Sequence, residues 1–311
     1  MDIRTGAVIV AAEDSPEGEA FRPLSELGGM TVAARVVANF RRAGITDIVM
    51  VTGFRGDELE RDLRYRGVTF LRNEDHMRTQ MLDSVKMGLA YLKDRCDRVF
   101  VCPGDRPFFT DETLRIMSRT EGEVVLPSCH GRAGHPVLLK AEALPAIVAY
   151  EGEGGLKGAI WSLDRPPVFA EVEDEGVLAG VKDADETERM LKERRADEIY
   201  CAVKVQLVAD RPFFGPGTVT LFKQIDRLGS VREACAKTGI SYSKGWSMIA
   251  QAEEVVGTRL ILRQTGGKKG GGAGITDRCR DIIDRYERLE RAVAEYARKS
   301  YGTFFGDAGL R

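Results

Sequence analysis

The sequence has few residues of the kinds that build metal sites or disulfide frameworks. Its 311 residues include three histidines and six cysteines, and no two cysteines have the CxxC spacing. The histidines form no HxxxH motif either, so a zinc site is not expected. Because the N-terminus carries no export signal, we expect the cysteines to be reduced thiols with a mainly structural role.

Long apolar segments are also missing. No stretch approaches the roughly 20 apolar residues that a membrane-spanning helix needs. The N-terminus has acidic residues where a signal peptide would need an apolar run. We therefore expect a cytoplasmic protein with no membrane partner. The apolar fraction of 43% and the charged fraction of 30% are ordinary for globular proteins and exclude a wholly disordered chain.

The formal net charge of −2 combines two parts of opposite sign. Residues 1–196 hold 27 Lys and Arg against 34 Asp and Glu, whereas residues 197–311 hold 19 against 14. The length fits two domains, and we place their boundary between residues 196 and 197. The basic C-terminal part indicates a nucleic-acid partner.

Apolar runs alternate with amphipathic segments along the first domain. The helical patterns lie at 31–42, 80–92 and 110–119, and the apolar runs lie at 7–12, 47–52, 68–71, 99–102 and 123–127. This alternation is typical of βαβ units and predicts an α/β domain with a doubly wound, mainly parallel sheet. Ligands of such sheets bind at the carboxyl ends of the strands, so the loops after Ala12, Thr52 and Cys102 are candidates.

The second domain has the punctuation of a helix-turn-helix between residues 230 and 257. Ser230 and Ser241 are suited to cap two helices, and Gly239 is suited to the turn between them. The second helix begins with hydroxyls and a lysine, which suit contacts with DNA phosphates and base edges. The alternative is an ordinary helical hairpin with Tyr242 and Trp246 in its core. The candidate DNA contacts on this helix are Ser241, Tyr242, Ser243, Lys244 and Ser247.

A glycine-rich segment follows the helix-turn-helix. LILRQTGGKKGGGAGIT predicts a strand, a tip with Lys268 and Lys269, and a return strand; the alternative is a flexible linker. These lysines and Arg263 would add phosphate contacts. The final helix, from about Asp277 to Lys299, has an apolar face that is either core or the seam of a homodimer. Ahead of the helices, IYCAVKVQLV predicts one long strand or a strand pair, and PFFGPG predicts a turn.

This second domain resembles the winged helix-turn-helix DNA-binding domain of the molybdate-responsive regulator ModE. The resemblance runs from about Phe214 to Tyr301 through IDRLGSVREAC, GISYSKGW and, most specifically, TGGKKGGGAGIT. It implies a winged domain that binds duplex DNA, usually as a dimer.

Three polar stretches lie at predicted strand ends of the first domain. Asp105 in PGDRP follows a buried strand, where a carboxylate can hold Mg²⁺ against a nucleotide phosphate; a turn aspartate is the alternative. The segment NEDHMRTQMLDSVKMGLAYL leads into a helix on which Ser84 is a candidate nucleotide contact. His135 lies in the glycine-rich turn GRAGHPVLL, ahead of a strand.

These stretches resemble the nucleotidyltransferases of molybdenum cofactor biosynthesis, which attach cytidylyl or guanylyl groups to molybdopterin. The resemblance covers about residues 6–195, and includes AVIVAA, FRPLSELGGMTV, PGDRP and GEGGLKGAI. It implies that Asp105 is a metal ligand and that KDADETER supplies a second one, Asp185 or alternatively Asp183. A helix-capping pair is the other interpretation of those two aspartates. The candidate nucleotide-binding residues are Ala11, Ala12, Ser84 and His135.

The first loop departs from this family's pattern. The family has A-A-G, then Gly and Arg-Met-Gly, then a Lys before Pro-Leu; here Glu13 follows Ala12, and SPEGEAF replaces the Gly/Arg portion. Arg22 takes the Lys position and keeps its positive charge. Backbone N–H groups of a glycine-rich loop cradle phosphates, and a carboxylate among them repels a phosphate by a few kcal/mol. The departure predicts a weakened triphosphate site.

Two functions follow from these patterns. In the first, the chain is a DNA-binding transcriptional regulator linked to molybdenum cofactor metabolism, and its transferase-like domain senses a nucleotide or the pterin cofactor. In the alternative, it is an active Mg²⁺-dependent cytidylyl- or guanylyltransferase that also binds DNA. The pterin's terminal phosphate would then attack the α-phosphate of CTP, GTP or ATP, with Asp105 and Arg22 as the catalytic residues.

Overall fold

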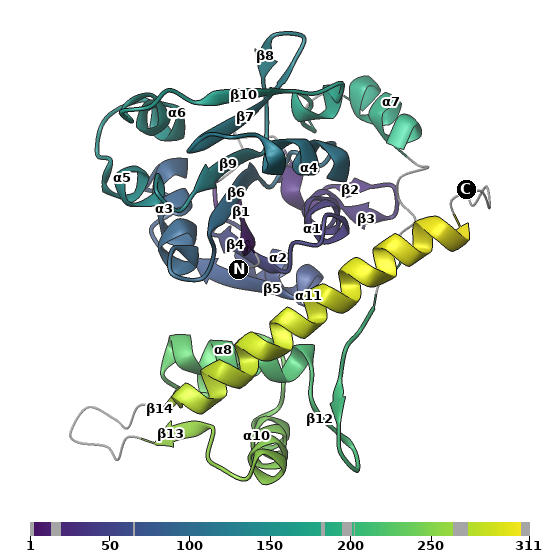
Figure 1. Cartoon of the computed structure of the whole chain (residues 1–311). Coiled ribbons are helices and arrows are strands. Elements are labelled where there is room, and N and C mark those ends of the chain that lie inside the picture. The colour runs from purple at the N-terminus through teal and green to yellow at the C-terminus, as the bar shows by residue number, and fades with distance from the viewer. Residues whose placement is uncertain are drawn as a thin grey trace. The chain divides into compact units, whose positions relative to one another are not determined.

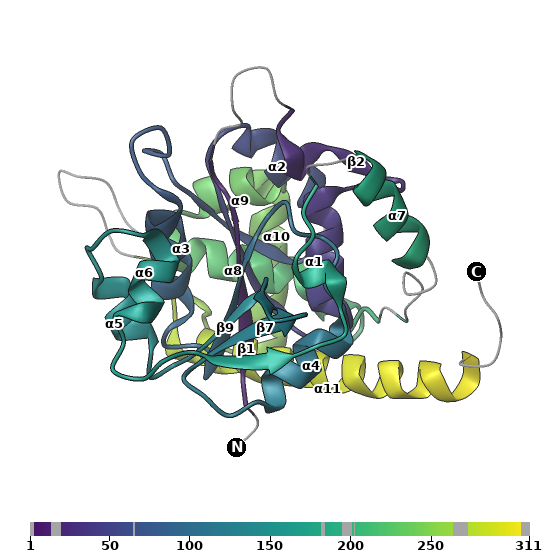
Figure 2. The ribbon, with the colours of Figure 1, turned by 90° about the horizontal axis from the view of Figure 1, so that it is seen from above.

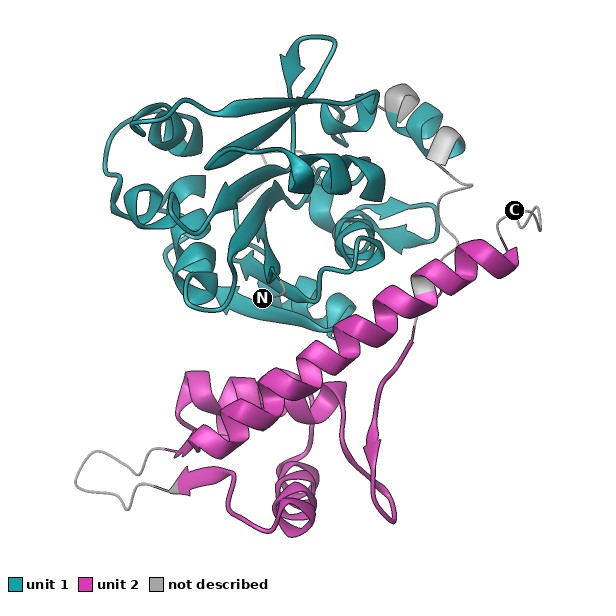
Figure 3. Cartoon of the chain, viewed as in Figure 1, with its two compact units in different colours: residues 1–200, 310–311 teal, residues 201–309 magenta. Residues whose placement is uncertain are grey.

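The computed structural model describes residues 3–13, 20–64, 66–181, 184–194, 201, 203–263 and 273–305. The chain divides into two compact units, residues 1–200 with 310–311 (unit 1) and residues 201–309 (unit 2), coloured separately in Figure 3. The boundary predicted at 196/197 falls in a segment outside the described residues. Within the described ranges, none of the helices combines the length and apolarity needed to cross a bilayer.

Unit 1 is built on one sheet with the strand order β10-β7-β9-β6-β1-β4-β5, and a short strand, β8, pairs with β7. β9 runs antiparallel to β6 and β7, β8 runs antiparallel to β7, and the other pairs are parallel. The predicted doubly wound, mainly parallel α/β fold is therefore confirmed. The strands are β1 Thr5–Ala11, β4 Asp47–Thr52, β5 Val68–Arg72, β6 Arg98–Pro103, β7 Val124–Cys129, β8 Arg132–Ala133, β9 Val137–Lys140 and β10 Val168–Glu171.

Helices cover both faces of this sheet, which is why its central strands β1, β4 and β6 are buried along almost their whole length. Alternate residues of β1, beginning with Ala7 and Ile9, pack against α1 (Val32–Arg42), α2 (Gly56–Leu63) and α4 (Asp111–Arg119). The residues between them, Val8 and Val10, pack on the face of α3 (Met81–Leu92), α5 (Leu144–Ala149) and α6 (Gly155–Trp161). Figures 1 and 2 show these two helical layers on either side of the strands. Each fully buried Val or Ile contributes roughly 1.5–3 kcal/mol.

Short elements complete unit 1 around the carboxyl end of the sheet. A 3-10 turn, η1 (Arg22–Leu24), precedes the hairpin of β2 (Glu26–Leu27) and β3 (Met30–Thr31). A second 3-10 turn, η2 (Glu175–Val177), and α7 (Ala184–Arg194) follow β10. Buried Asp174 fixes the start of α4, because it accepts hydrogen bonds from the hydroxyls of Thr110 (2.9 Å) and Thr113 (2.6 Å).

Unit 2 is a helix-turn-helix with a two-stranded wing. Its elements are β11 Leu207–Val208, β12 Pro212–Phe214, α8 Pro216–Leu228, α9 Val231–Thr238, α10 Tyr242–Val256, β13 Ile261–Arg263, β14 Ala273–Ile275 and α11 Asp277–Phe305. The predicted caps are confirmed: Ser230 and Ser241 each accept a backbone N–H bond of 3.3 Å, and Gly239 is left-handed with φ 66°. β13 and β14 pair antiparallel as predicted, and the tip between them lies outside the described residues. The core centres on Phe214, which packs on Phe222 and Tyr286.

Candidate functional site

The carboxyl ends of β1, β4 and β6 meet in a tight floor. A Cβ added at Gly104 would lie 2.9 Å from the Cβ of Ala11, and one added at Gly53 would lie 2.5 Å from the carbonyl oxygen of Ala12. Only glycine fits at either place without a shift. The N–H of Phe54 also donates to the carbonyl of Ala12 at 3.0 Å. Ala11 and Ala12 are buried in this floor, 4% and 1% exposed. Any contact they make with a nucleotide would therefore come from their backbone atoms, and that contact stays a prediction.

The structure brings the two predicted catalytic residues together. Asp105 follows β6, and Arg22 begins η1; the Nη1 of Arg22 lies 3.9 Å from the Oδ2 of Asp105. Arg106 flanks the same carboxylate, with its Nε 3.8 Å from Oδ1. Both separations exceed the hydrogen-bond range, so the guanidinium groups act on Asp105 mainly through charge. A carboxylate between two cations is the central feature of this site.

Arg106 is a site residue that the sequence patterns did not single out. Its Nη1 donates to the carbonyl oxygen of Leu178 at 3.0 Å. A Cβ added at Gly180 would lie 3.1 Å from its Nε and 3.2 Å from its Cζ. The segment after η2 thus packs closely against the guanidinium group, which a side chain at residue 180 would displace by a few tenths of an ångström. The available signal was an arginine directly after the strand-end aspartate in PGDRP.

His135 lies beside this cluster, in the turn between β8 and β9. Its backbone N–H donates to the carbonyl of Val177 at 2.8 Å. Burial lowers the pKa of His135 to about 4, the charge of Arg106 lowers it as well, and Asp105 acts in the opposite direction. The imidazole is therefore neutral at pH 7. Three predicted residues, Arg22, Asp105 and His135, share this edge of the sheet.

Glu13, the departure in the first loop, binds the start of α3. Burial raises the pKa of the Glu13 carboxyl, and the negative charge of Asp105 raises it slightly further. A hydrogen bond from the N–H of Met81 acts in the opposite direction and lowers this pKa. The N–H of Gln80 donates to Asp83 at 2.8 Å. Two carboxylates of the chain itself thus occupy the N-terminus of α3, the part of a helix that otherwise attracts anions. The SPEGE portion of the loop lies outside the described residues.

Ser84 is buried between α3 and the sheet. Its Oγ accepts a hydrogen bond of 3.1 Å from the Nδ2 of Asn73, and the same amide donates to Thr79 at 2.8 Å. With 1% of its surface exposed, Ser84 supports the loop between β5 and α3. Its contact with a nucleotide stays a prediction.

Of the three aspartates predicted to hold Mg²⁺, only Asp105 has a described side chain. No group of three or more His, Cys, Asp or Glu side chains within the described residues is arranged to hold a metal ion. Both ion pairs of Asp105 join it to guanidinium groups, which repel a divalent cation. Asp183 lies outside the described residues, and Asp185 belongs to α7 but its side chain is not described. The predicted second ligand is therefore not tested.

In unit 2, the candidate DNA contacts on α10 all face solvent. Gly245, Ile249 and Ala252 form the buried side of the helix. Tyr242 is 48% exposed, and the guanidinium of Arg232 on α9 lies 5.4 Å from its ring centroid. This excludes the alternative in which Tyr242 is a core residue, whereas Trp246 does pack partly against the core. The exposed residues at the start of α10 are Ser241, Tyr242, Ser243, Lys244 and Ser247.

The wing residues are only partly described. Arg263 ends β13 opposite Ala273, and its side chain is not described. Lys268 and Lys269 lie outside the described residues. Their contacts with DNA stay predictions.

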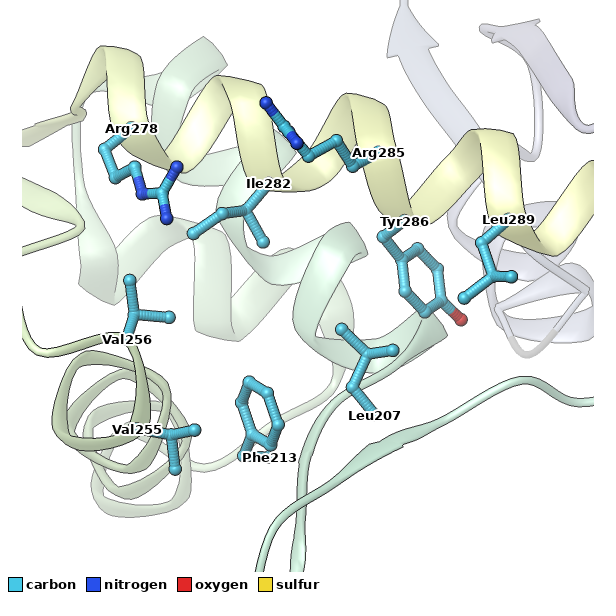
Figure 4. A pocket seen from close by; sticks show the side chains of 9 residues that line it. All are labelled: Leu207, Phe213, Val255, Val256, Arg278, Ile282, Arg285, Tyr286 and Leu289. Carbon is cyan, nitrogen blue, oxygen red and sulfur yellow. The ribbon is translucent and has the colours of Figure 1, made fainter.

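An apolar groove of about 390 Å³ lies between the end of α10 and α11 (Figure 4). Asp281 holds Arg278 and Arg285 at its rim, at 2.9 and 2.8 Å. The apolar face predicted for α11 is divided, since Tyr286 is buried and Leu289 is 43% exposed. The residues that line the groove are Leu207, Phe213, Val255, Val256, Arg278, Ile282, Arg285, Tyr286 and Leu289.

Two family models match the chain. The model of the MobA-like NTP transferase domain matches residues 7–168. The model of the bacterial regulatory helix-turn-helix protein, lysR family, matches residues 217–279. The predicted transferase-like and helix-turn-helix domains are thereby confirmed, and the helix-turn-helix is of the lysR type.

Curated relatives cover the second unit. The transcriptional regulator ModE of Haemophilus influenzae is 32% identical over 94 residues, 30% of this chain and 36% of that protein. The DNA-binding transcriptional dual regulator ModE of Escherichia coli is 31% identical over 113 residues, 36% and 40% of the two chains. The molybdenum-pterin-binding protein MopB of Rhodobacter capsulatus is 30% identical over 104 residues, 33% and 38%. The chain thus spans well under half the length of these relatives.

Solved structures resemble the first unit in fold. A nucleotidyl transferase from Methanothermobacter thermautotroptrophicus has a TM-score of 0.53 at 20% identity and covers 62% of this chain and 99% of its own. Rv0371c from Mycobacterium tuberculosis has a TM-score of 0.53 at 19% identity, covering 61% and 98%. A complex of Rv0371c with manganese has a TM-score of 0.50. Since the transferase model matches more than half of the 311 residues, the chain belongs to the MobA-like NTP transferase domain family, and a lysR-type helix-turn-helix follows that domain.

Proposed function

We propose that this chain is a DNA-binding transcriptional regulator linked to molybdenum cofactor metabolism. The observation that carries the proposal is the start of α10, where three hydroxyls, a tyrosine and Lys244 all face solvent while the opposite side of the helix is buried. Hydroxyls and a lysine at a helix N-terminus suit phosphate and base-edge contacts in a major groove. The likeness to ModE and MopB supports the molybdenum link.

Unit 1 is the sensing part of this regulator, and its ligand is a nucleotide or a pterin cofactor. Glu13 and Asp83 at the start of α3 disfavour a triphosphate there, while Arg22 and Arg106 keep positive charge nearby. The regulator acts on DNA as a homodimer. Leu289 and Tyr296 on α11, 43% and 74% exposed, support an apolar seam along that helix.

The DNA-binding role is tested with the full chain and a random duplex library. Rounds of selection should enrich one sequence, and footprinting should locate it. Lys244→Ala should weaken binding by about tenfold and reduce the salt dependence by about one phosphate contact. Lys299→Ala, an exposed lysine on α11, is the matched control and should bind like the parent chain. Unselective binding, or equal affinity of the Lys244 and Lys299 variants, would refute the role.

Transferase activity is the second candidate, and the approach of Arg22 to Asp105 favours it. The manganese complex of Rv0371c supports a divalent ion, Mg²⁺ or Mn²⁺, in an active protein of this fold. The measurement is pterin-dependent release of pyrophosphate from CTP, GTP or ATP. Release that disappears in Asp105→Ala would establish the reaction, and no release with any of the three nucleotides would exclude it.

A further inference from the structure

Unit 1 contains two guanidinium groups around one carboxylate, a cluster formed by Arg22, Asp105 and Arg106. Arg22 comes from η1, and the other two residues lie two and three positions after the end of β6. With separations of 3.9 and 3.8 Å, Asp105 aligns the two cations without taking up close hydrogen bonds. Within the three side chains, two guanidinium groups face one carboxylate, so positive charge predominates at the cluster itself.

Arg106 is held ready for a further partner. Its Nη1 is fixed by Leu178, and its guanidinium plane lies against Gly180. Its Nε is buried and has no hydrogen-bond partner in the described structure. A buried donor without a partner is unfavourable, and a phosphate oxygen that reaches it would supply the missing acceptor.

The side chains of the cluster are partly exposed, 29% for Arg22, 22% for Asp105 and 23% for Arg106, so a small anion can reach them. His135 is neutral at pH 7 and can share a hydrogen bond with an anion's oxygen. Among the described residues, Glu13 is another carboxylate that acts on Asp105, and its hydrogen bond with the N–H of Met81 directs it to the start of α3. A long triphosphate would meet Glu13, whereas a single phosphate group need reach only the two arginines.

We propose that the cluster of Arg22, Asp105 and Arg106 binds a phosphate group without a metal ion. The group is a free phosphate or the phosphate monoester of a nucleotide or pterin, and the two guanidinium groups supply the positive charge that a divalent ion supplies elsewhere. Guanidinium groups suit this role because their planar N–H forks match phosphate oxygens. The proposal deepens the sensing role proposed for unit 1 and rests on it.

Isothermal titration calorimetry of the full chain with inorganic phosphate, in excess EDTA, tests the proposal. The parent chain should bind, and Arg106→Gln should bind at least about tenfold more weakly. Asp105→Asn should bind about tenfold more tightly, because it removes the carboxylate that competes for the arginines. In a parallel titration with Mg²⁺ in place of EDTA, a metal-bridged site predicts the opposite sign, since Asp105→Asn would then lose binding. Arg165→Gln, which changes an exposed arginine elsewhere in unit 1, is the matched control.

Two further measurements keep the test independent of folding and of the DNA-binding role. Gly180→Ala preserves every charge but displaces the guanidinium of Arg106, so it should weaken phosphate binding at an unchanged melting temperature. AMP, CMP and GMP, titrated in parallel, distinguish a monoester from free phosphate, because tighter binding of one of them assigns the ester. Binding that EDTA abolishes, that Asp105→Asn loses, or that is absent from the parent chain would overturn the proposal. Mobility shifts with the same variants show whether the DNA-binding role stands or fails separately.

Discussion

Replacing Gly245 by alanine tests how closely the two helices of the helix-turn-helix approach each other. A Cβ added at Gly245 on α10 would lie 2.2 Å from the Sγ of Cys235 on α9, far inside the usual contact distance of about 3.5–4.0 Å. Overpacking of this kind costs about 1–3 kcal/mol, and a contact this short belongs at the upper end. Alanine also gains about 1 kcal/mol over glycine inside a helix. The net loss of unfolding free energy should be about 2 kcal/mol.

A second substitution should restore most of that loss. Cys235→Ala removes the Sγ, and the next atoms that the new methyl group would meet are Leu221 Cδ2 at 3.8 Å and the Cβ of residue 235 at 3.9 Å, which are ordinary contacts. Alone, Cys235→Ala should cost about 1 kcal/mol through the space left by the sulfur. In the double variant the new methyl group fills part of that space. The two changes should therefore couple by about 2 kcal/mol in the stabilising direction.

Urea unfolding followed by tryptophan fluorescence measures this coupling. The chain has two tryptophans, so Trp161→Phe in unit 1 leaves Trp246 on α10 as the reporter of unit 2. DNA affinity should follow the same order as stability, lowest for Gly245→Ala and recovered in the double variant. A Gly245→Ala chain as stable as its parent, or a double variant no better than the single one, would refute the inferred helix contact.

Three other substitutions test unit 1 and α11. His135 has a pKa of about 4 in the folded chain against its ordinary 6.5, so the unfolded chain binds more protons between these values. The unfolding free energy should therefore fall by up to roughly 3 kcal/mol as the pH drops from about 6.5 to 4. In urea titrations at several pH values, His135→Gln should show a smaller fall than the parent chain, and an equal fall in both would contradict this. Asp174→Asn should cost about 2–4 kcal/mol in the same assay, because it sets an amide donor against the hydroxyls of Thr110 and Thr113; a loss below about 1 kcal/mol would be too small for these bonds. Leu289→Lys should halve the mass measured by light scattering at an unchanged melting temperature, and a monomeric parent chain would rule out the homodimer.

The elements that the sequence predicted well depend on short-range physics. Strands β1, β4 and β6 each contain a continuous apolar run that is buried on both faces of the sheet, so their ends were predictable within a residue or two. The caps by Ser230 and Ser241 need only the N–H three residues ahead. By contrast, the insertion of antiparallel β9 between β6 and β7 depends on pairing between distant segments, which a local pattern does not record.

Where the sequence patterns misled, a distant partner decided the outcome. IYCAVKVQLV predicted one long strand or a strand pair, yet within its described part only Leu207–Val208 is a strand. It pairs with Pro212–Phe214, which was predicted as a turn. β-propensity needs a neighbouring strand to take effect. The place of Arg106 is set by Leu178 and Gly180, more than seventy residues along the chain. The carboxylate of Glu13 was predicted to repel phosphate, but its bond with the N–H of Met81 could not be inferred from spacing.

The two halves of the charge distribution lead to opposite uses of one structural element, the N-terminus of a helix. Both α3 and α10 begin with N–H groups equivalent to about half a positive charge. At α3, the carboxylates of Glu13 and Asp83 compensate that charge, so an incoming polyanion would meet repulsion. At α10, a neutral hydroxyl from Ser241 caps the helix and Lys244 adds a full positive charge beside it. The two carboxylates at α3 thus disfavour a polyanion in unit 1, whereas Lys244 favours one at the start of α10. This contrast agrees with the DNA-binding role proposed for unit 2 and with the single phosphate group proposed for the two arginines of unit 1.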